Sequence, residues 1–379
     1  MIKVKLKNWW LLLLLLVTLL SGCQKKAVAK TPAAAPHGFT STTNYATKDS
    51  SQNSLRLSNF VRHNLLTKKG IYTNYLDTNK RQPDAATGHE MLSESSGLWL
   101  QYLASSHQWG QFRQFYQQTK QTFLKKGLFM YRYDPQKNKL FKVNATLDDL
   151  RIIRALLTYD EAKHTDHYRQ EATERYQALL NTALRDGQLV DFYDVGSHQG
   201  ANTASLAYFD MQTLKYFENT TKKSQHDYQR QMTVLKGGYL GDAFPLYANS
   251  YQWSSSKYSD DDLNTSEALE TLLHLAEIGQ LKATSRDWLV QRIQKRDLAN
   301  GYSVIGRVSS DGESAANYAL AAMIFAELHD QENYSLAMKS VWRLQINQPH
   351  SLLNGGIGDN KTQKIYSYNN LTALNASQR

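Results

Sequence analysis

Helical periodicity along almost the whole chain is the sequence feature that most constrains its fold. Apolar side chains return at the spacing of one buried helix face, as Leu57, Phe60 and Val61 illustrate. Helices are predicted to begin near residues 52, 91 and 107 and then to occupy 146–162, 167–186, 202–219, 223–236, 263–279, 284–296, 313–329 and 332–346. Strand-like alternation is limited to short pieces at 129–133 and 302–304, so an all-α fold is expected.

The connections between these segments are of two lengths. Turns such as 162–166 are short and polar, whereas 186–200 and 237–262 are long and rich in aromatic residues. No repeat of fixed period is visible, which favours a closed helical array over an open superhelix. Long loops on a rigid scaffold commonly carry functional side chains, so the site is expected at the end where these loops gather.

The N-terminus has the pattern of a bacterial lipoprotein signal. Three lysines within the first seven residues precede the apolar run 11–20, which is too short for a comfortable membrane span. Leu20-Ser-Gly-Cys23 follows and resembles the lipobox, in which the cysteine is lipidated. We therefore expect a signal peptide over 1–22 and a lipid anchor on Cys23, which would hold the protein at the extracellular face of the cytoplasmic membrane.

Composition divides the mature chain into two parts. Residues 23–50 are rich in Lys, Ala, Pro, Ser and Thr and hold few large apolar side chains, so a flexible tether is expected there. Residues 51–379 form the predicted domain, which is expected to be a monomer. The net charge of +10 comes without a dense Lys/Arg cluster interleaved with aromatics, which argues against a nucleic-acid partner.

Several common catalytic motifs are absent from the sequence. It contains no GxSxG, HExxH or paired CxxC pattern, and Cys23 is its only cysteine. The Gly-rich segment 355–358 lacks the spacing of a nucleotide-binding loop. We therefore expect no metal, no cofactor and no disulfide framework. Acidic residues at the starts of apolar helices are the pattern that remains.

Glu94 is the first of these acids. Small residues surround it at 93–97, and an apolar helical run follows. A carboxylic acid at the rim of an apolar wall can have its pKa raised and act as a general acid. The alternative is an ordinary first-turn glutamate that the helix dipole stabilises.

Two further acidic groups precede apolar helices. Asp148 and Asp149 open one helix, and an Asp triplet at 260–262 precedes another. Either group could instead cap its helix, and Thr146 with Asp149 has the spacing of a capping box. If the three acid-bearing helices are parallel neighbours, however, their carboxylates share one cleft.

These stretches resemble glycoside hydrolase family 8. Ser-Glu-Ser-Ser-Gly at 93–97 is similar to the family's Ser-Glu-Gly-x-Gly, and 145–157 resembles its Ala-Thr-Asp-x-Asp-Leu-x-Ile-Ala-x-Ala-Leu-Leu. Residues 205–210 resemble its Pro-Ser-Tyr-Phe segment, and 258–266 are more weakly similar to its Tyr-Asp-Ala-x-Arg-x-Pro. Order and spacing agree over about 70–350. The resemblance implies an (α/α)6 barrel of twelve helices.

The resemblance also implies an endo-acting glycosidase that cleaves β-1,4 linkages of a polysaccharide with inversion. Glu94 takes the place of the general acid and Asp261 that of the base, with Asp260 as the competing register. Asp149 matches the second Asp of the family's Asp-x-Asp, and Tyr208 matches the Tyr of its Ser-Tyr-Phe segment.

Two positions depart from the family pattern. Leu147 stands where the family's first Asp contacts the reacting sugar, and Asn264 stands where the family has Arg. Asp148 could replace the missing acid through a local shift. If it does not, a non-catalytic glycan-binding lipoprotein on the same scaffold is the alternative. A polysaccharide lyase with a Tyr or His base is the third possibility.

A polysaccharide groove also needs flat aromatic faces for its sugar rings. Tyr251 and Trp253 lie in a long loop and are the preferred candidates, with Trp99 as a further one. The leading prediction is thus a membrane-tethered glycosidase that acts on an exopolysaccharide at the bacterial cell surface.

Overall fold

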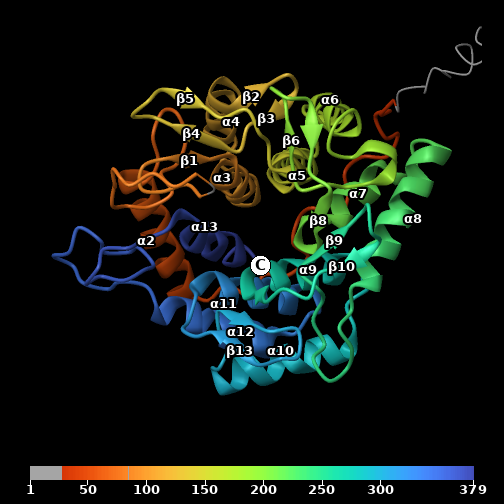
Figure 1. Cartoon of the computed structure of the whole chain (residues 1–379). Coiled ribbons are helices and arrows are strands. Elements are labelled where there is room, and N and C mark those ends of the chain that lie inside the picture. Colours follow the sequence, from red (N-terminus) through yellow and green to blue (C-terminus); the bar gives the residue numbers. More distant parts are fainter. Residues whose placement is uncertain (1–27, 84) are drawn as a thin grey trace, which may run out of the picture.

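The computed structural model describes residues 28–83 and 85–379, in which twelve α-helices form two concentric rings (Figure 1). The inner ring consists of α3 (Ser93–Ser105), α5 (Thr146–Lys163), α7 (Met211–Glu218), α9 (Thr265–Glu277), α11 (Ala315–Glu327) and α13 (Ser367–Ala376). The outer ring consists of α2 (Lys48–Asn64), α4 (Trp109–Phe123), α6 (Arg169–Leu180), α8 (Lys222–Gly237), α10 (Ala283–Lys295) and α12 (Gln331–Arg343). Because α13 packs against both α11 and α3, the inner ring closes, and the predicted (α/α)6 barrel is confirmed.

Burial explains why the helices divide into two rings. Every residue of α11 except Glu327 is buried, and a helix that is apolar on all sides must lie between other elements. Outer helices have a single apolar face, which in α4 consists mainly of Phe112, Phe115 and Phe123. None of the helices in the described part of the chain is long and apolar enough to cross a bilayer.

Short antiparallel sheets surround the N-terminal ends of the inner helices. The strands are β1 (Met91–Leu92), β2 (Leu124–Lys125), β3 (Leu128–Phe129), β4 (Arg132–Asp134), β5 (Lys139–Leu140), β6 (Tyr193–Asp194), β7 (Gln199–Gly200), β8 (Thr203–Ser205), β9 (Ser250–Gln252), β10 (Lys257–Tyr258), β11 (Leu263–Asn264), β12 (Gly301–Tyr302) and β13 (Val308–Ser310). They pair in the orders β1-β4-β5, β10-β9-β8, β11-β12-β13, β2-β3 and β6-β7. Since β1 runs directly into α3 and β11 directly into α9, these sheets fix how the inner helices begin.

The start of α7 differs from the prediction. The periodicity predicts a helix from residue 202, whereas α7 begins at Met211, after β8 and a short 3-10 turn. The Asp210 side chain caps α7 by accepting a hydrogen bond from the Thr213 amide. A good cap therefore sets the boundary that the apolar pattern alone misplaces.

The sequence does not predict α13, the helix that closes the barrel. Its asparagines interrupt the apolar pattern, but each has a partner from another part of the fold. Asn370 Nδ2 donates to the carbonyl of Ile357, and Asn375 Nδ2 donates to that of Leu98, both at 2.9 Å. Buried amides are tolerated when they are paired in this way, and such partners are not visible in a local pattern.

Residues 28–47, here called the strap, lie along the barrel. The Glu161 carboxylate near the end of α5 accepts hydrogen bonds from the backbone amides of Gly38, Phe39 and Thr40 at 2.8, 2.6 and 2.9 Å. The Phe39 side chain is only 5% exposed and belongs to the core. The prediction of a flexible tether is therefore wrong for the strap, because the barrel supplies the partners that the strap lacks by itself. The predicted signal peptide, Cys23 and the rest of the tether up to residue 27 lie outside the described residues.

A chain that lacks residues 1–47 should be less stable than one that lacks only 1–27. Deleting the strap removes the buried Phe39 ring and leaves Glu161 without its three amide donors. Phe39→Ala alone should lower the free energy of unfolding by about 3 kcal/mol, as for other buried phenylalanines. Denaturant unfolding followed by circular dichroism measures both effects.

The matched control is Val28→Ala, because Val28 is an exposed apolar residue of the same strap. Its effect on the free energy of unfolding should stay below about 0.5 kcal/mol. Equal unfolding midpoints for the two truncated chains would show that the strap does not stabilise the barrel.

Candidate active site

One arginine joins acids from three inner helices at their N-terminal ends. Arg151 Nη1 lies 3.7 Å from Glu94 Oε2 of α3 and 3.3 Å from Asp148 Oδ1 of α5. Arg151 Nη2 donates to Glu270 Oε1 of α9, which also accepts a 2.8 Å hydrogen bond from the Tyr368 hydroxyl of α13. The N-terminal ends of α3, α5 and α9 therefore meet in one cluster of carboxylates.

The Glu94 carboxyl has the properties expected of a proton donor. Its side chain is 27% exposed, so part of it is accessible to solvent while the rest lies against the protein. Burial raises the pKa of Glu94 to about 8; Arg151 opposes the shift, and Asp148 adds to it by repulsion. A group with this pKa is mostly protonated at neutral pH and can donate its proton.

The two aspartates of α5 have different positions. Asp148 lies in the cluster and accepts a 2.7 Å hydrogen bond from Ser93 Oγ, while burial raises its pKa. Asp149 lies behind the cluster and accepts from the Phe129 amide at 2.8 Å and Asn144 Nδ2 at 2.7 Å. Burial raises the pKa of Asp149 to about 8 against these two donors. The structure thus brings Asp148, and not Asp149, into contact with the groups around Glu94.

The alternative prediction, that Asp149 or the Asp triplet at 260–262 caps its helix, is wrong. The N-cap residue of α5 is Ala145, and the Thr146 hydroxyl donates to the Val190 carbonyl at 2.6 Å. The N-cap residue of α9 is Asn264, whose side chain accepts from the amides of Ser266 and Glu267. Asn264, which departs from the family pattern, is thereby explained as a cap.

The Asp triplet at 260–262 lies before this cap. Asp260 and Asp261 are exposed in the segment between β10 and β11. Within the described residues, neither side chain makes a hydrogen bond or an ion pair with another group. The first turns of α9 instead present Glu267 and Glu270, and it is Glu270 that shares Arg151 with Glu94.

The aromatic residues predicted to bind sugar differ in their exposure and contacts. Tyr208 is partly exposed, and burial and the nearby Asp148 raise the pKa of its hydroxyl. Trp253 and Tyr251 contact each other edge-on at 5.0 Å, and Trp253 Nε1 donates to the carbonyl of Leu189 at 2.6 Å. Trp99 is 1% exposed and lies in the core, so its prediction as a sugar contact is wrong.

Leu147 is 3% exposed, so the side chain that departs from the family pattern is a core residue and leaves no polar group there.

Several residues of the carboxylate cluster around Arg151 were not predicted from the sequence. Arg151 and Glu270 were visible as charges inside otherwise apolar helices, which is the signal that could have found them. Tyr368 belongs to the unpredicted α13.

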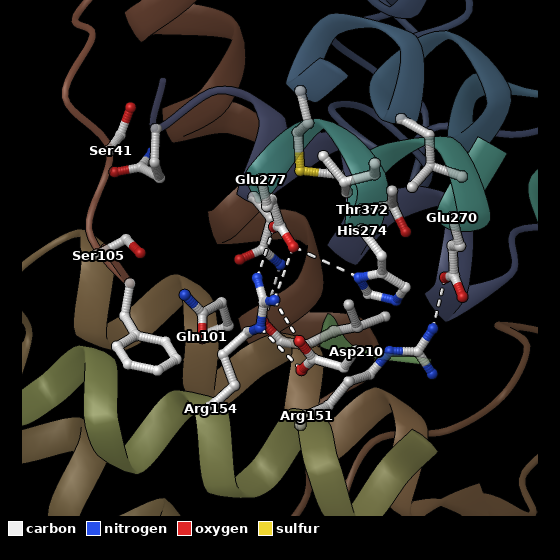
Figure 2. A pocket seen from close by; sticks show the side chains of 18 of the residues that line it. Ser41, Gln101, Ser105, Arg151, Arg154, Asp210, Glu270, His274, Glu277 and Thr372 are labelled. Atoms are coloured by element: carbon white, nitrogen blue, oxygen red, sulfur yellow. Dashed lines mark hydrogen bonds and ion pairs between the residues drawn. The ribbon is translucent and has the colours of Figure 1, made fainter. Parts of the chain in front are cut away.

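A second charged network lies deeper in the barrel, in a pocket that Arg151 and Glu270 also line (Figure 2). Arg154 Nε donates to Asp210 at 3.0 Å, and its two terminal nitrogens donate to both oxygens of Glu277 at 2.6 and 2.7 Å. His274 Nδ1 lies 3.4 Å from Glu277 Oε2. His274 Nε2 has no hydrogen-bond partner among the described residues.

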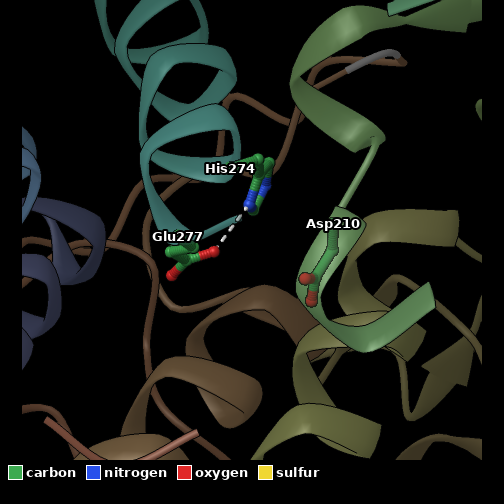
Figure 3. A group of neighbouring side chains, drawn as sticks. All are labelled: Asp210, His274 and Glu277. Carbon is green, nitrogen blue, oxygen red and sulfur yellow. Dashed lines mark hydrogen bonds and ion pairs between the residues drawn. The ribbon is translucent and has the colours of Figure 1, made fainter. Parts of the chain in front are cut away.

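Asp210, His274 and Glu277 are of the types that bind divalent metals (Figure 3). Their ligand atoms lie within 4.8 Å of one another. Both carboxylates are, however, already engaged by the Arg154 guanidinium. A metal ion would have to displace this guanidinium, so the positive charge of the network is supplied by the chain itself.

Comparisons with known proteins identify others that share this architecture. No family model matches the sequence. The putative lipoprotein YdaJ of Bacillus subtilis is 26% identical over 325 residues, which are 84% of this chain and 85% of YdaJ. The structure of a novel alpha-amylase from Clostridium perfringens is 30% identical, with a TM-score of 0.80, covering 86% of this chain and 97% of that one. Endoglucanase Cel10, a family 8 glycosyl hydrolase from Klebsiella pneumoniae, is 16% identical with a TM-score of 0.57, covering 76% and 98%.

Proposed function

Because the chain belongs to the family of the Clostridium perfringens enzyme and has the fold of glycoside hydrolase family 8, we propose that it is a glycosidase whose proton donor is Glu94. The observation that carries the proposal is the partly buried Glu94 carboxyl, with a raised pKa, at the rim of the Arg151 cluster. Such a group is protonated at neutral pH and is therefore ready to protonate a glycosidic oxygen.

The proposed reaction is hydrolysis with inversion at the anomeric carbon. Glu94 protonates the leaving oxygen while a second, ionised carboxylate removes a proton from the attacking water on the opposite face of the sugar. Five carboxylates, those of Glu94, Asp148, Asp191, Glu267 and Glu270, interact electrostatically in this region, so a second acid is available. The chain's own side chains supply both roles.

Two linkage classes are candidates for the substrate. The sequence motifs favour a β-1,4-linked polysaccharide, while the name of the Clostridium perfringens relative favours an α-linked glucan. A reducing-end assay over soluble starch, β-glucan, xylan, chitosan and poly-N-acetylglucosamine separates the two. NMR of the first product, before mutarotation, then gives the anomeric outcome. New reducing ends with an inverted anomer support the proposal, whereas a wild-type protein that cleaves none of the panel contradicts it.

We further propose that the enzyme is lipid-anchored through Cys23. The Leu20-Ser-Gly-Cys23 sequence supports this, as does the name of the Bacillus subtilis relative. Cys23→Ala should release the protein from the membrane fraction or leave it unprocessed at its full length. Cell fractionation with immunoblotting measures the result. Unchanged fractionation and migration of the variant would refute the anchor.

A further inference from the structure

We propose that Glu267, in the first turn of α9, is the base that activates the attacking water, in place of Asp261. This inference rests on the proposed glycosidase function and names the second catalytic residue of that reaction. It starts from the position of Glu267 relative to Glu270, whose place in the cluster is fixed by direct contacts.

Glu267 and Glu270 lie three residues apart on α9, so their side chains are on the same face of the helix. Glu270 is buried and bound by Arg151 and by the Tyr368 hydroxyl. Glu267 lies one turn closer to the N-terminus of α9, and its side chain is exposed. It therefore stands on the cluster's face of α9 but nearer to solvent, where water can reach it.

The other carboxylates near Glu94 have their oxygens occupied. Asp148 accepts from Ser93 Oγ and Arg151, and it shares Arg151 Nη1 with Glu94 at 3.3 and 3.7 Å. That arrangement leaves little room for a sugar and a water between the two acids. Glu270 accepts from Arg151 and Tyr368.

Asp191 is occupied as well, because its two oxygens accept from the Ser205 amide at 2.5 Å and the Thr203 hydroxyl at 2.6 Å. Glu267 differs from all of these acids. Within the described residues its carboxylate makes no hydrogen bond or ion pair. A base needs an open oxygen that can hold and deprotonate water, and Glu267 has one.

The charges around Glu267 act on its carboxyl in opposite directions. Although the residue as a whole is exposed, partial desolvation of its carboxyl raises the pKa of Glu267, Glu270 and Asp191 add to this shift, and Arg151 opposes it. The N-terminus of α9, capped by Asn264, favours an ionised acid in the first turn. The negative charge of Glu267 in turn helps to keep Glu94 protonated. The two acids differ in their contacts, because Glu94 lies against Arg151 whereas the Glu267 carboxylate makes no hydrogen bond or ion pair within the described residues and is open to water.

The proposed hydrolysis is a single displacement at the anomeric carbon. The water oxygen bonds to the anomeric carbon as the bond from that carbon to the glycosidic oxygen breaks. The leaving oxygen takes the proton of Glu94, and Glu267 takes one proton from the water. Both carboxyls then exchange protons with solvent to restore the starting state.

The test compares Glu267→Gln with Asp261→Asn on a substrate that the wild type cleaves. Glu267→Gln should lower kcat by at least about a hundredfold and remove the acidic limb of the pH profile. Added azide, which attacks without a base, should restore turnover and yield the glycosyl azide. Asp261→Asn should stay within about threefold of the wild type, since its exposed side chain has no contact in the cluster.

Equal melting temperatures of Glu267→Gln and the wild type serve as the folding control. Near-normal turnover of Glu267→Gln, together with azide-rescued loss in Asp261→Asn, would overturn the assignment and leave the glycosidase function standing. Turnover that survives Glu94→Gln as well would instead overturn the proposed function itself.

Discussion

Glu94→Gln should lower turnover by at least about a hundredfold while glycan binding persists. The amide keeps the shape of the side chain but cannot deliver a proton to the leaving oxygen. Binding is retained because the rest of the Arg151 cluster is unchanged, apart from one ion pair at 3.7 Å. Initial rates from the reducing-end assay, with a binding isotherm for the same polysaccharide, measure the two effects separately.

The pH dependence of the activity follows from the protonation of Glu94. Glu94 acts in its protonated form, and its pKa is raised to about 8. Activity should therefore be retained at neutral pH and fall as the pH rises through about 8, where the proton is lost. A profile that keeps rising beyond this pH would contradict the role of Glu94 as the acid.

The matched control is Glu332→Gln. Glu332 is an exposed glutamate in the first turn of α12, an outer helix, so it shares the helix position of Glu94 but lies outside the Arg151 cluster. Its loss should cost only the favourable interaction with the helix dipole, about 0.3–1 kcal/mol of stability, and leave turnover unchanged. A similar loss of activity in both variants would mean that the effect is not specific to the cluster.

Local patterns were sufficient for the barrel and for the position of its site. Helix periodicity predicted most of the helices, and the acids at 94 and 148 were recognisable because each opens an apolar helix. Which acids lie in the first turns of α9 was not visible in the same way. That choice depends on the cap, because Asn264 starts the helix after the Asp triplet and places Glu267 in its first turn.

The strap and α13 were misjudged for a related reason. Both segments are polar, and both are ordered by partners that are distant in sequence, such as Glu161 for the amides around Phe39. A pattern within one segment contains no information on such partners. The Arg154 network is a similar case, since its members come from α5, α9 and the start of α7.

Arg154→Met should lower the free energy of unfolding by about 3–5 kcal/mol, because it leaves two buried carboxylates without their cation. Burial alone would raise the pKa of Glu277, but the Arg154 guanidinium holds it well below its usual range. The pKa of Asp210 is lowered by the same guanidinium against its burial. Chemical denaturation at pH 7 measures the loss, and Arg56→Met, which removes an exposed arginine of α2, is the control.

The origin of this loss can be tested by neutralising the stranded acids. Arg154→Met combined with Asp210→Asn and Glu277→Gln removes both charges and should recover a large part of the stability.

The direction in which pH changes the stability also follows from these groups. Since the Glu277 pKa is depressed in the folded state, its pairing stabilises the wild type above the unfolded pKa of about 4.3 and is lost as the pH falls further. The gap between wild type and Arg154→Met should therefore be wide at pH 7 and narrow at low pH, where the acids of the variant are protonated. A gap that is independent of pH, and that the added neutral residues do not reduce, would mean that the packing of the Arg154 side chain holds the barrel together and its charge does not.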